Sequence, residues 1–208
     1  LGAKRVAVTG NLKFDVAPPG PGELQRDAFE GDWLWLAGST HPGEEATLFE
    51  THRALGRRHP DRRLQLLLAP RHPARTPEIL ALARAAGFSV IPRSQMAALG
   101  ELAALYALAE AAFVGGSLVD HGGQNPLEPA AGGCPVVTGP DMRNFAHAVA
   151  LLSEARAILT VNNDAGLLEA LDAWVRNPQA GADMAARAAR VLETNQGATR
   201  RTLEMLEP

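Results

Sequence analysis

The sequence predicts an α/β protein with a Rossmann-like parallel sheet of about six strands and helices on both faces. Two observations carry this prediction. Apolar stretches of strand length alternate with helical stretches along most of the 208 residues. The apolar stretches are also continuous, as in "WLWLAG", instead of alternating with polar residues. Continuous apolar strands are typical of parallel sheets that are covered on both faces.

The expected elements follow one another along the chain. "RVAVTG" (residues 5–10) is either a short strand or an initial segment, and "PPGPG" (Pro18–Gly22) is a surface loop. Strands are expected in "WLWLAG", "LQLLLAP", "FSVIP", "AFVGG", "PVVTG" and "AILTV" (residues 33–38, 64–70, 88–92, 112–116, 135–139 and 157–161). Helices are expected near residues 42–58, 76–87, 99–111, 144–155, 164–177, 183–195 and 198–207, the second opening at Thr76 with Pro77 in its first turn.

Composition and charge restrict the classes of function. The hydrophobic fraction of 46% and the net charge of −3 exclude wholesale disorder and give no basic footprint for nucleic acid or an anionic membrane. The single cysteine, Cys134, excludes an internal disulfide and a multi-cysteine metal site, and is expected to be a small buried filler. No apolar run reaches the roughly 18 residues that span a bilayer. Because the first residue is Leu1, we expect a piece of a longer or processed protein.

Polar and glycine-rich clusters follow four of the expected strands. They are Gly38–Thr40, Arg71 with its neighbours, Gly115–Ser117 and residues 138–140. Ligands of parallel sheets bind beyond the carboxyl ends of the strands, so these clusters are expected to lie at one edge. We also expect the glycines near Gly115 to let the backbone approach a ligand closely.

Each cluster has a bland and a functional interpretation. Ser39 or Thr40 is either the N-cap of the next helix or a donor to an anion at that helix start. Arg71 is either a phosphate-binding guanidinium or one half of a surface ion pair. His41 and His72 have no partner at metal-ligand spacing and are expected in structural or loop roles.

The "NPLE" motif leaves two interpretations open. Asn125 as N-cap, Pro126 as first helical residue and Glu128 two positions later form the pattern of a capping box. A carboxylate at Glu128 is equally suited to accept hydrogen bonds from paired ribose hydroxyls. The "GGS" at Gly115 matches neither a Rossmann fingerprint nor a P-loop, and no catalytic triad or zinc motif stands out. From the residues alone, we expect a phosphate- and sugar-compatible cleft without obvious catalytic machinery.

Four segments together resemble a known family. "VTGNLKFD", "LAGSTHPGEE", "LAPRHPAR" and "GGSLVDHGGQNPLEPAAGGCPVVTGPDMRNF" (residues 8–15, 36–45, 68–75 and 115–145) are similar, in this order, to the 3-deoxy-D-manno-octulosonic acid (Kdo) transferases. The resemblance implies the C-terminal, donor-binding half of a GT-B glycosyltransferase, with residues 1–208 forming one CMP-Kdo binding domain. Enzymes of this family transfer Kdo from CMP-Kdo to a lipid A precursor at the cytoplasmic face of the bacterial inner membrane, without a bound metal or other cofactor.

The resemblance also implies roles for individual residues. Ser39, Thr40 and Arg71 would hold the CMP phosphate, with Arg71 stabilising its developing charge. Gly115, Gly116 and Ser117 would let the backbone approach the nucleotide, while Asn125 and Glu128 would face the nucleotide and its ribose. The acceptor site, the membrane anchor and the general base are expected in an N-terminal half that is absent from this soluble fragment, which we therefore expect to be inactive alone.

The sequence departs from the family pattern at two places. Gln124 replaces the usual His of "GGHNPLEP", and "AALGE" (Ala97–Glu101) replaces the usual "DTMGE", which removes two polar groups. Two other functions remain open: a UDP-sugar-dependent GT-B glycosyltransferase or epimerase domain, and a non-catalytic nucleotide-binding module.

Overall fold

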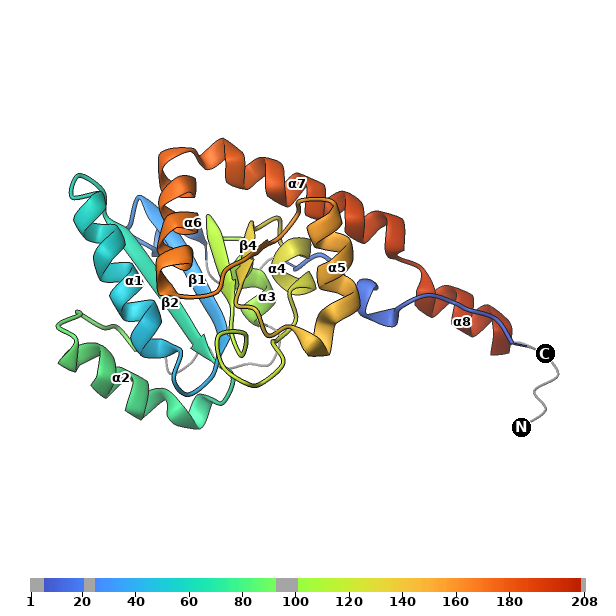
Figure 1. Cartoon of the computed structure of the whole chain (residues 1–208), viewed down its shortest axis with the longest axis horizontal. Coiled ribbons are helices and arrows are strands. Elements are labelled where there is room, and N and C mark those ends of the chain that lie inside the picture. The colour runs from blue at the N-terminus through green and yellow to red at the C-terminus, as the bar shows by residue number, and fades with distance from the viewer. Residues whose placement is uncertain (1–5, 21–24, 93–100, 207–208) are drawn as a thin grey trace.

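The core of the fold is a parallel sheet of five strands (Figure 1). The structure, a computed structural model, describes residues 6–20, 25–92 and 101–206. The strands are β1 (Trp33–Thr40), β2 (Leu64–Pro70), β3 (Ala111–Val114), β4 (Val136–Thr138) and β5 (Leu159–Thr160). They lie in the order β2-β1-β3-β4-β5, and each neighbouring pair is parallel. The chain builds the sheet outward in two directions, so the strand order reverses between β1 and β3.

Helices cover both faces of this sheet (Figure 1). They are α1 (Glu45–Arg58), α2 (Thr76–Ala85), α3 (Glu101–Tyr106), α4 (Leu127–Ala131), α5 (Ala146–Glu154), α6 (Asp164–Arg176), α7 (Pro178–Asn195) and α8 (Ala198–Leu206), with short 3₁₀ turns at Leu12–Phe14, Arg26–Ala28, Pro73–Arg75 and Arg143–Phe145. The predicted fold class is therefore confirmed.

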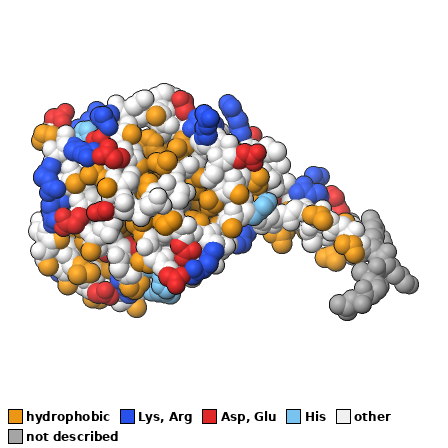
Figure 2. Space-filling model, in the orientation of Figure 1, with side chains coloured by type: hydrophobic (Ala, Val, Ile, Leu, Met, Phe, Trp, Pro, Cys, Tyr) orange, Lys and Arg blue, Asp and Glu red, His pale blue; other side chains and the backbone are white. Residues whose placement is uncertain are grey.

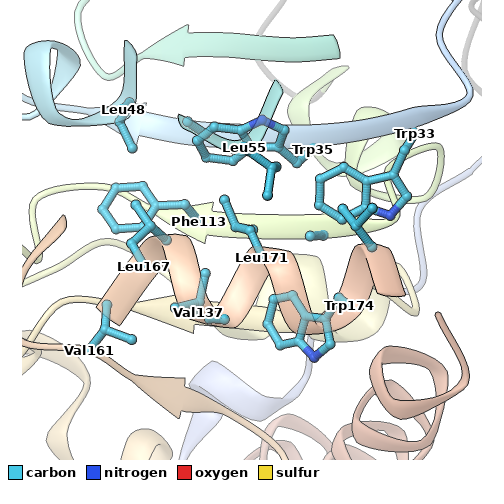
Figure 3. Packing of buried hydrophobic residues seen from close by; sticks show 14 residues of the cluster. Trp33, Trp35, Leu48, Leu55, Phe113, Val137, Val161, Leu167, Leu171 and Trp174 are labelled. Atoms are coloured by element: carbon cyan, nitrogen blue, oxygen red, sulfur yellow. The ribbon is translucent and has the colours of Figure 1, made fainter. Parts of the chain in front are cut away.

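Alternate residues of β1 supply two separate cores. Trp35 joins Leu48 of α1 and Leu171 of α6 in the cluster on one face (Figure 3). Leu36, the next residue, packs with Tyr106 in a cluster on the other face. Trp35 and Leu36 are both fully buried. This two-sided burial explains why the strand reads as a continuous apolar run.

The expected strand at residues 88–92 is not formed, which is a correction to the predicted count of about six strands. Phe88 follows α2 directly, and its backbone N–H donates to the carbonyl of Ala83. Phe88 and Val90 pack against a small cluster that includes Phe49 and Ile79. The apolar side chains of this segment thus cover α1 and α2 without pairing with β2.

Residues 6–10 form no strand either, and instead lie beside the last helix. The Arg201 guanidinium donates to the carbonyl of Thr9, and the Asp15 carboxylate accepts from the N–H groups of Gly197 and Thr199. These bonds join the two ends of the described chain into the projection at the right of Figure 1.

Two further expectations concern charge and membrane spans. Basic and acidic side chains are interspersed over the face shown in Figure 2, in keeping with the absence of a basic footprint in the sequence. Within residues 6–20, 25–92 and 101–206, no helix is long and apolar enough to cross a membrane. The departure at Ala97–Glu101 falls almost wholly outside the described residues.

Candidate functional site

The candidate site lies at the point where the strand order reverses. Gly38 near the end of β1 lies beside Val114 at the end of β3, so the loops that follow these strands emerge together. The backbone N–H of Arg71, after β2, donates to the carbonyl of Thr40 over 3.0 Å. Three of the predicted polar clusters are thereby brought to one edge of the sheet, where parallel sheets bind ligands.

A buried carboxylate, Glu44, holds two of these loops together. Its side chain is 1% exposed. Oε2 accepts hydrogen bonds from the N–H groups of His41 (2.9 Å) and Gly116 (2.8 Å). Oε1 accepts from the N–H groups of Ser117 and Leu118, both over 3.1 Å. Four donors on one carboxylate compensate for its burial and fix the loop after β3 against the loop after β1.

The glycine at position 115 allows the loop after β3 to pack closely against β1. A Cβ atom on Gly115 would lie 2.4 Å from the carbonyl oxygen of Ser39, and the Gly115 N–H donates to the carbonyl of Gly38. The N–H groups of Gly116 and Ser117 face Glu44. Gly115 therefore allows a close approach of β1, and the expectation that these glycines let the backbone approach a ligand stays a prediction.

Ser117 and Thr40 have internal partners. The Ser117 hydroxyl donates to the carbonyl of Val114 and accepts from the N–H of Gly139. The Thr40 hydroxyl donates to Glu45, whose buried carboxylate also receives two hydrogen bonds from Arg75 (2.7 and 3.2 Å). Both hydroxyls lie on fully buried residues.

The N-cap interpretation of Ser39 and Thr40 is wrong. The cap position of α1 is occupied by Glu44, several residues further along the chain. Ser39 is half-buried and adopts a left-handed backbone conformation, with φ of +56°. Such a conformation is uncommon for a residue other than glycine, and here it turns the chain out of β1.

Arg71 is exposed at the same edge of the sheet. Its neighbour Arg75 is bound by Glu45 and Glu78, but within the described part of the chain the Arg71 guanidinium forms no ion pair. The surface-ion-pair interpretation is therefore not supported there, and a guanidinium with open donors remains at the site.

Three histidines gather beside Arg71, one from each of the three loops. The rings of His41 and His121 are stacked with centroids 4.2 Å apart, and His72 meets His41 edge-on at 6.0 Å. The Nε2 atom of His41 lies 3.1 Å from the side-chain nitrogen of Gln124. Burial, followed by the positive neighbours His121, His72, Arg71 and Arg75, lowers the pKa of His41.

The "NPLE" motif forms a different cap from the one predicted. The Asn125 side-chain oxygen accepts from the N–H of Leu127, and its amide group donates to Glu128 Oε1, both over 3.0 Å. The cap position is taken by Pro126, and Glu128 bonds to a side-chain amide where a capping box would bond to a backbone N–H. The capping-box interpretation is wrong, and Glu128 stays half-buried with its carboxylate near Tyr106, whose pKa is raised by burial and by that charge.

Sequence reasoning missed Glu44, Arg75 and the histidine cluster. The two glutamates of "HPGEE" were a local signal for buried carboxylates, but most of their partners lie about 30 to 74 residues away. Among the described residues, no group of three or more His, Cys, Asp or Glu side chains is arranged to hold a metal ion.

Comparison of the sequence with known proteins identifies relatives of this chain. No family model matches the chain. The chain is 35% identical over 223 residues to the 3-deoxy-D-manno-octulosonic acid transferase of Haemophilus influenzae, covering 99% of this chain and 52% of that protein. The enzyme of the same name from Bordetella pertussis is 36% identical over 224 residues, with the same coverage.

Among solved structures, the C-terminal CMP-Kdo binding domain of WaaA from Acinetobacter baumannii superposes with a TM-score of 0.72 at 28% identity, over 78% of this chain and 90% of that domain. The chain is a homologue of the Kdo transferases. It matches the C-terminal domain of WaaA and spans about half the length of the curated relatives. The resemblance predicted from the four sequence segments is confirmed. The C-terminal domain of the glycosyl transferase LpcC from Francisella tularensis, at 13% identity and a TM-score of 0.57, shares the fold.

Proposed function

We propose that this Kdo transferase homologue binds CMP-Kdo at the edge of the sheet between β1 and β3. The observation that carries the proposal is the similarity, over nearly the whole domain, to the CMP-Kdo binding domain of WaaA. In the parent enzyme, this domain would present the donor for transfer of Kdo to a lipid A precursor in lipopolysaccharide biosynthesis. That protein would work at the cytoplasmic face of the inner membrane.

The accessible side chains at the site suit a nucleotide monophosphate. Arg71 has open guanidinium donors for the phosphate, and the hydroxyl of Ser39 lies on the same edge. The half-buried carboxylate of Glu128 is suited to accept from the ribose hydroxyls, with Asn125 holding its orientation. Gly115, Gly116, Ser117 and Thr40 contribute by building the loops, because their polar groups are bonded inside the protein.

The reaction would be a direct displacement. A hydroxyl of the acceptor attacks the anomeric carbon of Kdo, the bond between that carbon and the phosphate oxygen breaks, and CMP leaves with the electron pair. The phosphate gains charge in the transition state, so the Arg71 guanidinium would stabilise the transition state more than the bound donor. The general base that takes the hydroxyl proton is expected outside these residues, and no metal is required.

Calorimetric titration with CMP tests the site. We expect Arg71→Ala and Glu128→Ala each to weaken CMP binding by at least about tenfold, which corresponds to about 1.4 kcal/mol. Arg57→Ala, which removes an exposed arginine from α1, is the matched control and should leave the affinity unchanged. Unchanged affinity in both site variants would remove these residues from the proposed site. Chelation of divalent metals should have no effect, and detectable Kdo transfer by the chain alone would contradict the assignment of the base to another part of the protein.

A further inference from the structure

The histidine cluster consists of His41, His72 and His121. The resemblance of the sequence to the Kdo transferases did not predict that these three side chains meet. Its three rings come from the loops after β1, β2 and β3, so only the folded domain brings them together. His41 is buried, whereas His72 and His121 are exposed on the same edge as Arg71. The buried imidazole of His41 thus contacts two exposed imidazoles, and the exposed Arg71 is close enough for its charge to act on it.

Without a ligand, the surroundings of His41 disfavour a positive charge on its ring. The stacked rings of His41 and His121 are 4.2 Å apart, and like charges at such a distance disfavour each other. The side-chain nitrogen of Gln124 is a hydrogen-bond donor, so at 3.1 Å from Nε2 of His41 it pairs with a ring nitrogen that carries no proton. In this orientation Gln124, the residue that departs from the family pattern, favours the neutral form of His41.

The carboxylates near His41 do not compensate for a positive charge on its ring. The Glu44 carboxylate accepts the backbone N–H of His41, but it is shared with three further backbone N–H groups. Glu45 is paired with Arg75, and the charges of Arg71 and Arg75 both act on His41. Within the described residues, no carboxylate forms an ion pair with His41, His72 or His121. An anion from outside the protein would supply the missing negative charge.

We infer that an anionic oxygen group of the donor binds against Arg71, His72 and His121, above His41, and that the histidine cluster takes up a proton from solvent when it binds. The inference rests on the proposed function and adds the protonation state of that same site. The bound anion replaces the repulsion within the cluster by attraction, so a protonated imidazole becomes the favoured form. The proton forms one new N–H bond, and the donor keeps its charge.

Proton uptake makes donor binding dependent on pH. When binding takes up protons, affinity falls as the pH rises, by up to about tenfold per pH unit for one proton. Since burial and positive neighbours lower the pKa of His41 in the free protein and a bound anion raises it, the fall should appear between these two values. Tight donor binding would thus be favoured at neutral to mildly acidic pH.

The test is calorimetric titration with CMP at pH 7.5, where the phosphate of free CMP is already a dianion, in buffers of different ionisation heat. The observed heat should vary with the buffer, with a slope that corresponds to uptake of part of a proton up to one proton per CMP. The His41→Gln variant should reduce this slope while an exposed control on α5, His147→Gln, should preserve it. Gln124→Glu places a carboxylate beside His41, so the imidazole is already protonated and uptake should likewise be lost.

The outcomes separate this inference from the function on which it rests. Failure of CMP to bind contradicts the proposed function, and the inference falls with it. Binding of both CMP and CMP-Kdo with heats that are independent of the buffer, or an undiminished slope in His41→Gln, overturns the inference while leaving the proposed function standing. If cytidine, which lacks the phosphate, binds with the same proton uptake, the anion is not its cause and the inference is also wrong. Uptake that appears only with CMP-Kdo assigns the anion to the Kdo carboxylate and supports it.

Discussion

Replacement of Glu44 by glutamine should destabilise the domain far more than its small chemical change suggests. In the native protein each carboxylate oxygen accepts two backbone N–H groups. A glutamine side chain has one accepting oxygen, and its NH₂ group would point at two N–H donors. Each buried donor left without an acceptor costs about 1–3 kcal/mol, so the two together should cost about 2–6 kcal/mol.

This cost is a large part of the total stability of a domain, which is typically about 5–15 kcal/mol. A loss of about 4 kcal/mol corresponds to a fall in melting temperature of roughly 8–16 °C for a chain of this size. Urea unfolding followed by circular dichroism measures the free energy difference. Glu50→Gln is the matched control: it removes the same charge from the exposed side of α1, where the partner is Arg53. Its effect should stay within about 0.5 kcal/mol.

The reasoning is refuted if Glu44→Gln lies within about 1 kcal/mol of the wild type. That result would mean that the loop after β3 keeps its conformation without the buried carboxylate, or that the burial of the charge costs as much as its four hydrogen bonds contribute. A loss of stability equal to that of Glu50→Gln would lead to the same conclusion.

Two further predictions concern the core near the site. Gly38→Ala should lower the free energy of unfolding in urea by about 1–3 kcal/mol, because the added Cβ would lie 1.9 Å from the Tyr106 hydroxyl oxygen. The control Gly56→Ala, whose Cβ would have no atom within 4 Å, should be neutral or stabilising. Equal effects of the two substitutions would be inconsistent with this packing. Burial lowers the pKa of His52 to about 4 from 6.5, so the unfolded chain binds the proton first and stability should fall by about 3 kcal/mol as the pH drops through this window. His52→Gln, which retains an acceptor for the Trp35 indole N–H, should flatten the stability curve there, and an unchanged slope would argue against this origin.

The sheet was predictable because its signal is local. The run at Trp33–Gly38 is apolar on consecutive residues, and burial of both Trp35 and Leu36 is what such a run requires. The segment at residues 88–92 has a similar composition but covers two helices, and composition does not distinguish these two uses of apolar side chains.

The site was less predictable because its contacts are long-range. Local spacing suggested a capping box at Asn125 and Glu128, whereas the carboxylate bonds to the Asn125 side chain. Nothing in the spacing of His41 and His121 indicates that their rings stack, because two loops must first converge. The polar clusters that follow the strands predicted the edge of the sheet, and the residue roles in donor binding that the resemblance implies stay predictions.

The central claim is that the CMP part of the donor binds at the edge between β1 and β3. The most direct measurement is a titration of the isotope-labelled chain with CMP and with UMP, followed by NMR of the backbone amides. The account predicts CMP-selective shifts concentrated at Ser39–His41, Arg71, His72 and residues 115–128. Stronger shifts with UMP would favour a UDP-sugar enzyme, and CMP-induced shifts centred elsewhere would contradict the proposed site.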